Sequence, residues 1–129
     1  MSVGVRKPPN QVIMNESRPS GSKGTFATFG LGKNVLRALG EAGFQHPRPI
    51  QTETIPQALN GRDILGLAQT GTGKTAAFAL PLIERLNANP GNNPRALILA
   101  PTRELVVQIH REIELLARYT NIRAMTVYG

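Results

Sequence analysis

Apolar residues follow two periodicities along this chain, one typical of helices and one typical of buried strands. Between residues 31 and 42 they recur on one helical face, and the same spacing returns between residues 102 and 118. Three short runs, 63–68, 95–100 and 124–128, are almost continuously apolar, as strands of a buried parallel sheet are. Helices are also expected at 50–59 and from Lys74 to about Asn87.

From residue 63 onward the expected elements alternate as strand, helix, strand, helix and strand. This alternation favours an α/β fold, with a parallel sheet of about three strands, flanking helices and right-handed crossovers. Ligands of such folds bind at the carboxyl ends of the strands. The segments 70–75 and 101–105 each follow an expected strand, so we expect both to lie at that edge of the sheet.

The first 24 residues differ in composition from the rest of the chain. They are rich in proline, serine and glycine, and they carry four cations against one glutamate. Such a stretch cannot bury enough apolar surface to fold, so residues 1–24 are expected to form a disordered basic tail. Residues 25–129 are then the folded part.

Charge and residue usage narrow the function further. The formal net charge of +7 suits an anionic partner such as nucleic acid, although solvated basic faces would explain it as well. The chain has no cysteine, which excludes disulfides, thiolate metal sites and a cysteine nucleophile. No apolar run is long enough to span a membrane, and the first residues lack the apolar centre of a secretory signal. We therefore expect a cytoplasmic protein.

Residues 68–75 carry the clearest chemical signal. They read Ala-Gln-Thr-Gly-Thr-Gly-Lys-Thr and lie between an expected strand and an expected helix, which is the setting of a phosphate-binding P-loop. Glycines let successive backbone N–H groups converge on one anion, Lys74 reaches the outer phosphates, and the Thr75 hydroxyl holds Mg²⁺. The general pattern has glycine where this chain has Ala68. An ordinary glycine-rich turn is the alternative.

Hydrolysis of a nucleoside triphosphate needs more than this loop. A carboxylate at the end of an apolar strand must help to hold the metal, and another group must orient the attacking water. Asp63 stands at the start of its strand, and Glu104 lies in a first helical turn, where an acidic residue complements the helix dipole. The sequence therefore predicts nucleotide binding without visible hydrolytic groups.

Several stretches resemble the motifs of DEAD-box RNA helicases. Residues 43–51 resemble the Q motif, with Phe26 as the upstream aromatic, and residues 68–75 are identical to the usual motif I, including Ala68. Residues 101–105 resemble motif Ia, and Tyr128-Gly129 resembles the start of the Gly-Gly motif. The similarity extends over residues 25–129.

This resemblance implies a nucleotide site for ATP and Mg²⁺. Gln51 would read adenine, since a carboxamide pairs with its N6/N7 edge, and Phe26 would lie against the adenine ring. The phosphates would be bound by Ala68, Gln69, Thr70, Gly71, Thr72, Gly73, Lys74 and Thr75. Lys74 and Thr75 would be the catalytic residues, with Thr75 on the metal. The alternatives are that Gln51 only begins a helix and that Phe26 only anchors the core.

The resemblance also implies a path for the RNA backbone. Pro101, Thr102, Arg103 and Gly129 would contact phosphates, which gives binding without base specificity. A merely solvated Arg103 in the first helical turn is the alternative. Because an arginine there opposes the helix dipole, a functional reason is favoured.

The chain departs from the family pattern in two ways. Arg48 replaces the usual serine or threonine of the Q motif, and the 129 residues contain no acidic box, no Ser-Ala-Thr motif and no second RecA-like domain. The resemblance therefore implies the N-terminal part of the first RecA-like domain of an ATP-dependent RNA helicase, not expected to hydrolyse ATP alone. A stand-alone nucleotide- or RNA-binding module is the alternative. A DNA-directed helicase is disfavoured by Phe26 and Gln51.

Overall fold

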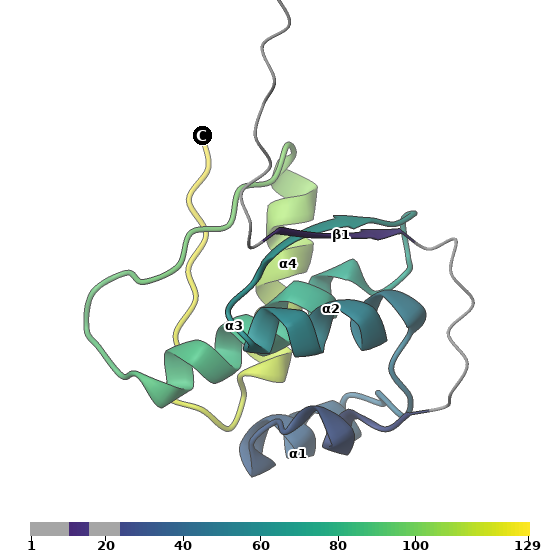
Figure 1. The fold of residues 1–129 in the computed structure, drawn as a ribbon. Helices are drawn as coiled ribbons and strands as arrows, with labels where there is room; N and C mark the ends of the chain where they lie inside the picture. Colours follow the sequence, from purple (N-terminus) through teal and green to yellow (C-terminus); the bar gives the residue numbers. More distant parts are fainter. Residues whose placement is uncertain (1–10, 16–23) are drawn as a thin grey trace, which may run out of the picture.

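The structure, a computed structural model, describes residues 11–15 and 24–129 (Figure 1). Its elements follow in the order β1 (Gln11–Asn15), a 3-10 turn η1 (Phe26–Phe29), α1 (Lys33–Glu41), α2 (Pro49–Leu59), β2 (Asp63–Leu67), α3 (Lys74–Ala88) and α4 (Arg103–Leu116). All four helices expected from the sequence are confirmed, with bounds that differ by at most two residues. Within the described residues no helix combines the length and apolar character needed to cross a lipid bilayer.

The helices begin and end at residues suited to those positions. Helix α2 starts with Pro49, whose ring fixes a helical φ angle and whose missing N–H is not needed in the first turn. Helix α4 is capped by Thr102, whose hydroxyl oxygen accepts a hydrogen bond from the Leu105 N–H at 3.2 Å. Helix α1 gives way to Gly43, which has a φ of +82°. Local sequence therefore accounts for these boundaries.

The described sheet has two strands, β1 and β2. They run parallel, with Gln11 opposite Asp63 and Asn15 opposite Leu67. Strand β2 was expected, whereas β1 falls in the stretch that the sequence assigned to a disordered tail. The rest of that expected tail, residues 1–10 and 16–23, lies outside the described residues.

The expectation of about three parallel strands is not confirmed. Residues 95–100 and 124–128 are extended but belong to no sheet among the described residues. Their side chains still alternate: Ile98 and Ala124 pack on the core, whereas Leu97 and Leu99 are each 83% exposed. An extended segment becomes a strand only when a neighbouring segment forms backbone hydrogen bonds with it. Among the described residues, neither 95–100 nor 124–128 has such a neighbour in a sheet.

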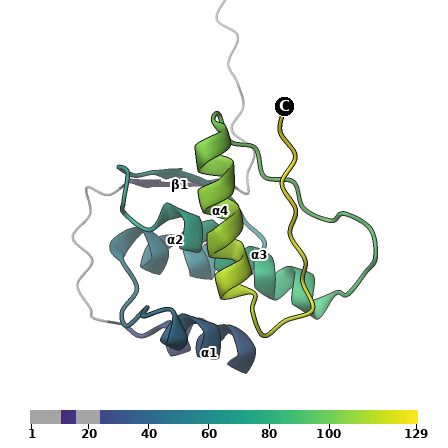
Figure 2. The same ribbon diagram turned by 180° about the vertical axis from the view of Figure 1, so that it is seen from behind.

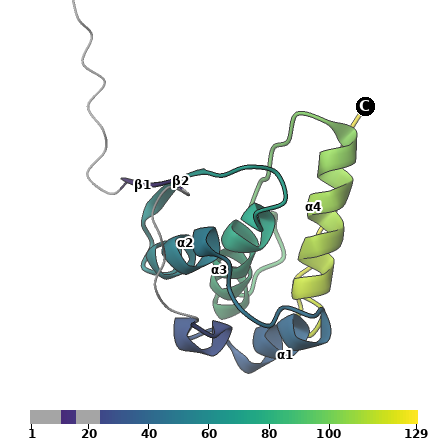
Figure 3. The ribbon, with the colours of Figure 1, turned by 90° about the vertical axis from the view of Figure 1, so that its right-hand side faces the viewer.

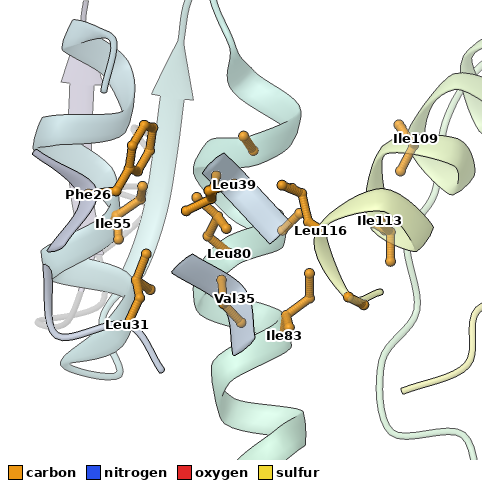
Figure 4. Packing of buried hydrophobic residues seen from close by; sticks show 13 residues of the cluster. Phe26, Leu31, Val35, Leu39, Ile55, Leu80, Ile83, Ile109, Ile113 and Leu116 are labelled. Atoms are coloured by element: carbon orange, nitrogen blue, oxygen red, sulfur yellow. The ribbon is translucent and has the colours of Figure 1, made fainter. Parts of the chain in front are cut away.

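Helices α2 and α3 lie on one side of the two strands, and α4 lies on the far side of α3 from the strands, as Figures 1 and 3 show. Figure 4 shows the core between the helices, where side chains from η1, α1, α2, α3 and α4 meet. Leu39, Ile55, Leu80 and Leu116 are fully buried there. This packing fixes the start of α2 close to the start of α3.

Candidate functional site

The loop between β2 and α3 has the backbone shape that the sequence predicted. Gly71 and Gly73 have φ angles of +81° and +85°, a region that residues with a Cβ rarely adopt. The Thr72 hydroxyl donates to the Gln69 carbonyl at 2.7 Å, which tightens the turn. Helix α3 then begins at Lys74 with no capping side chain, because its N-cap residue is Gly73. The first N–H groups of α3 therefore face the loop, where an anion would bind.

Three side chains hold the carbonyl groups of this loop. The Lys74 ammonium donates to the Ala68 carbonyl at 2.6 Å, and the Arg48 Nη1 donates to the Gly71 carbonyl at 2.6 Å. The Gln51 Nε2 donates to the Gly73 carbonyl at 3.1 Å. Lys74 thus folds back over the loop, and two residues at the start of α2, its N-cap Arg48 and its third residue Gln51, reach the loop from outside.

Gln51 is inaccessible in this arrangement. It is 1% exposed, and its Oε1 accepts a hydrogen bond from the Arg48 N–H at 2.9 Å while its Nε2 is held by the loop. Because Gln51 is the third residue of α2, its bond to Arg48 satisfies a backbone group at the helix start. The structure thus shows a role at the helix start, and adenine reading by Gln51 stays a prediction.

Phe26 is likewise a core residue here. It is 4% exposed and meets the rings of Phe29 and Phe44 edge to face, at centroid distances of 6.0 and 6.1 Å. This is the core-anchor alternative that the sequence left open. The contact with an adenine ring stays a prediction, since the Phe26 side chain is buried here.

A second group of predicted residues gathers at the start of α4. Pro101, Thr102 and Arg103 are exposed there, and residues 121–129 run back beside the helix (Figure 2). The Arg103 guanidinium donates to the Gly129 carbonyl and lies 4.9 Å from the centroid of the Tyr128 ring. Two RNA contacts predicted 26 residues apart are therefore neighbours. Tyr128 was not predicted as a site residue; its only signal was an aromatic residue beside Gly129.

The predicted metal residue Thr75 is half-buried in the first turn of α3. Asp63 begins β2, at the opposite end of the strand from the loop, and Glu104 lies in the first turn of α4, as expected. Among the described residues no three histidine, aspartate or glutamate side chains cluster to hold a metal ion. Any Mg²⁺ held by these residues would therefore rely on the Thr75 hydroxyl and on phosphate oxygens.

Glu112 is a further charged group near this site that the sequence did not single out. It lies on α4, is half-buried and hydrogen-bonds to the backbone of Ala76 in the first turn of α3. Burial raises the pKa of its carboxyl, and the backbone hydrogen bond lowers it by a smaller amount. Glu112 thus links α4 to the start of the helix that follows the loop.

A family model and the curated relatives of this chain point to the same protein family. The family model described as DEAD/DEAH box helicase matches residues 48–129. The chain is 43% identical over 115 residues to the ATP-dependent RNA helicase DBP10 of Candida albicans, which covers 89% of this chain and 13% of that protein. It is 46% identical over 123 residues to DEAD-box ATP-dependent RNA helicase 28 of Oryza sativa, covering 94% of this chain and 15% of that protein.

Solved structures similar to this chain come from proteins of the same family. The chain matches the RNA helicase Prp28 of Chaetomium thermophilum bound to ADP, with 41% identity, a TM-score of 0.76, and coverage of 81% of this chain and 26% of that one. A DEAD box protein of Methanococcus jannaschii matches with 45% identity and a TM-score of 0.69, covering 77% and 26%. The chain thus spans 13% and 15% of the two curated relatives and about a quarter of the solved chains.

Proposed function

The chain belongs to the DEAD/DEAH box helicase family, and from this premise we propose that it supplies part of the ATP site and part of the RNA path of an ATP-dependent RNA helicase. The conformation of residues 68–75 carries this proposal. Two glycines with positive φ curl the loop, Lys74 lies across it, and α3 begins at its end. These features suit the binding of phosphate groups.

Binding of a triphosphate would change the contacts of Lys74. The ammonium now donates to the Ala68 carbonyl, a neutral acceptor, at 2.6 Å. A phosphate oxygen carries charge and makes the stronger hydrogen bond, so Lys74 is expected to turn from Ala68 to the outer phosphates. The Thr75 hydroxyl, one residue further along α3, would then bind Mg²⁺ beside the same phosphates.

The adenine part of the proposal rests on Gln51 and Phe26. Prp28, a protein with a similar fold, was solved with bound ADP. Gln51 already lies against the loop at Gly73, next to where a nucleotide would sit. To read adenine its carboxamide would have to exchange the bonds to Gly73 or Arg48 for bonds to the base, and Phe26 would need its ring uncovered.

The RNA part rests on the start of α4. Arg103 is exposed, and its guanidinium is held between the Gly129 carbonyl and the Tyr128 ring. The N-terminal N–H groups of α4 lie beside it, and both features attract backbone phosphates. Pro101, Thr102 and Gly129 would line the same path, so binding would not depend on base sequence.

We propose further that these 129 residues alone do not hydrolyse ATP, because they contain no acidic pair after an apolar strand. A second RecA-like domain in the same polypeptide would complete the site in the whole helicase. A cytoplasmic location, which fits the absence of cysteine, is part of this proposal. Phosphate release by the purified chain, stimulated by RNA and lost in Lys74→Ala, would contradict the proposal that these 129 residues alone do not hydrolyse ATP.

Nucleotide binding is tested by titrating the 129-residue chain with a fluorescent ATP analogue. Lys74→Ala is expected to weaken binding about 10- to 100-fold, the loss of one or two charge-assisted hydrogen bonds to phosphate. Lys33→Ala is the matched control, since Lys33 is an exposed lysine at the start of α1, in a different element from the loop. Equal affinities for the wild type and Lys74→Ala would rule out the proposed site.

A further inference from the structure

Arg48 has an exposed side chain that reaches the loop at residues 68–75. We propose that Arg48 is a positioning residue of the phosphate-binding loop. Its guanidinium fixes the Gly71–Thr72 peptide group so that the Thr72 N–H faces a bound phosphate. This inference rests on the proposed function of the loop, and it concerns a position at which the chain departs from the usual serine or threonine.

The first argument is the geometry of the peptide group. In a planar trans peptide the C=O and the following N–H point in opposite directions. The Arg48 Nη1 holds the Gly71 carbonyl at 2.6 Å, so the Thr72 N–H must point away from Arg48. The same reasoning applies at Gly73, whose carbonyl is held by Gln51, and there it directs the Lys74 N–H. The two side chains together direct the N–H groups of Thr72 and Lys74 away from the start of α2.

The second argument is the freedom of Gly71. Its φ is +81°, and no heavy atom outside Gly71 and its two chain neighbours lies within 4 Å of the place where a Cβ would stand. A glycine in open space does not fix the orientation of its own peptide groups. A contact from outside the loop is therefore needed, and the Arg48 guanidinium makes it.

The third argument is the support behind Arg48. Its N–H donates to the Gln51 Oε1 at 2.9 Å, and its carbonyl accepts from the N–H groups of Gln51 and Thr52 at 2.9 and 3.0 Å. It directly precedes α2, which packs on α3 through the buried Ile55 and Leu80. The arginine side chain extends from this fixed backbone along the loop, with its Cδ 3.2 Å from where a Cβ on Gly73 would lie. A short hydroxyl side chain would end well before Gly71.

The test measures the affinity of the 129-residue chain for ADP and for a fluorescent ATP analogue in four variants. Arg48→Ala is expected to weaken both about five- to tenfold, because the Thr72 N–H would no longer be held toward the phosphate and its hydrogen bond would weaken. Arg48→Lys, which keeps a cationic donor of similar length, should recover most of the affinity, and Arg48→Thr should not. Arg62→Ala is the matched control: it removes an exposed arginine that donates to Gln57 near the other end of α2, and it should stay within about twofold of the wild type.

A second readout separates positioning from a general loss of structure. In nucleotide-free protein, the backbone amide signal of Thr72 should shift in the nitrogen–proton NMR spectrum of Arg48→Ala, while amide signals of α4 stay in place. The thermal unfolding temperature should hardly change, because the guanidinium is exposed. If it does fall, Arg48→Gln, which keeps most of the side-chain stem, is compared with Arg48→Lys in the same way.

The outcomes distinguish the inference from the function on which it rests. If neither the wild type nor Lys74→Ala binds nucleotide, or both bind equally, the proposed function fails. If Lys74→Ala loses binding while Arg48→Ala stays within about twofold of the wild type, only the role of Arg48 is overturned. An affinity of Arg48→Lys as low as that of Arg48→Ala, or an unchanged Thr72 signal, also overturns it.

Discussion

The two predicted binding segments, 68–75 and 101–103, are built in different ways. The first follows a paired strand, and side chains of Arg48, Gln51 and Lys74 hold its carbonyl groups. The second follows an extended segment that has no strand partner among the described residues. Glycine conformation and the start of α3 curl residues 68–75 locally, and side chains 22 and 23 residues away then hold the loop. At residues 101–103, by contrast, it is Arg103 of the segment itself that contacts distant residues, Gly129 and Tyr128.

Burial behind the two segments differs in the same sense. Ile55, in the helix beside residues 68–75, is 0% exposed. Leu65 and Leu67 of β2, just before that loop, are 42% and 53% exposed. Leu97 and Leu99, just before residues 101–103, are each 83% exposed. Met125 and Val127 add exposed apolar side chains on the other extended segment. Open apolar segments with unpaired backbone groups promote association between chains. We therefore expect the isolated chain to be only marginally stable and prone to aggregate.

The largest difference should appear in stability. Ile55→Ala is expected to lower the free energy of unfolding by about 2–5 kcal/mol, because it leaves a cavity between α2 and its neighbours. Leu97→Ala, which removes a similar side chain from solvent, should change it by less than about 0.5 kcal/mol. Urea titration followed by circular dichroism measures both. Equal losses would mean that residues 95–100 are covered in solution.

The next effect concerns one glycine from each predicted site, Gly73 in the loop and Gly129 beside Arg103. In Gly73→Ala the new Cβ would collide with the Gln51 carboxamide, at a φ that itself costs about 1–2 kcal/mol for a residue with a Cβ. We expect nucleotide affinity to fall by more than about tenfold. In Gly129→Ala the new Cβ meets nothing within 4 Å, so affinity for ATP should not change. Tight nucleotide binding by Gly73→Ala would show that the loop adopts another shape in solution.

A smaller effect is expected at the RNA segment. Tyr128→Ala removes the ring beneath the Arg103 guanidinium, a contact worth about 0.5–1 kcal/mol at an exposed site. Affinity for single-stranded RNA, measured by fluorescence anisotropy at fixed salt, should fall about two- to fivefold. Tyr128→Phe keeps the ring and serves as the control. An RNA affinity that responds equally to both variants would assign the effect to the hydroxyl and not to the ring.

The smallest effect is a dependence on pH at Glu112. Burial raises the pKa of its carboxyl in the folded chain above the usual value for a glutamate, so the folded state keeps the proton to a higher pH than the unfolded state does. Folding therefore becomes less favourable as pH rises from the usual pKa of a glutamate through the raised pKa of Glu112. Glu112→Gln should remove this loss. The free energy of unfolding of the variant, minus that of the wild type, should be higher at pH 7 than at pH 4 by a few tenths of a kcal/mol. Unfolding curves at both pH values test the sign; a loss at pH 7 would contradict it.

Much of the fold and part of the site could be predicted from local sequence. The spacing of apolar residues located the four helices, and the string from Ala68 to Thr75 predicted a curled loop that ends as α3 begins. Thr102 before the apolar periodicity predicted the start of α4. These features depend on residues within about one helical turn of each other, so their causes are visible in the sequence.

Contacts between distant residues could not be predicted in this way. Nothing in the residue pattern indicated that Gln11–Asn15 pairs with β2, since a five-residue run does not specify its partner strand. It suggested strands at 95–100 and 124–128 from apolar content alone, although a strand also requires a neighbour with free backbone groups. The contacts of Arg103 with Tyr128 and Gly129 likewise join residues far apart in the sequence, so no local pattern predicted them.

The sequence by itself determined that residues 68–75 form a tightly curled loop that ends where α3 begins, because glycine conformation and helix initiation are local properties. Tertiary structure alone decided how that loop is held. Packing of α2 on α3 buries Gln51 and brings Arg48 to the Gly71 carbonyl, 23 residues away. Packing of the aromatic rings likewise encloses Phe26 in the core. Which polar groups remain open to a ligand depends on such packing, and no local pattern of residues records it.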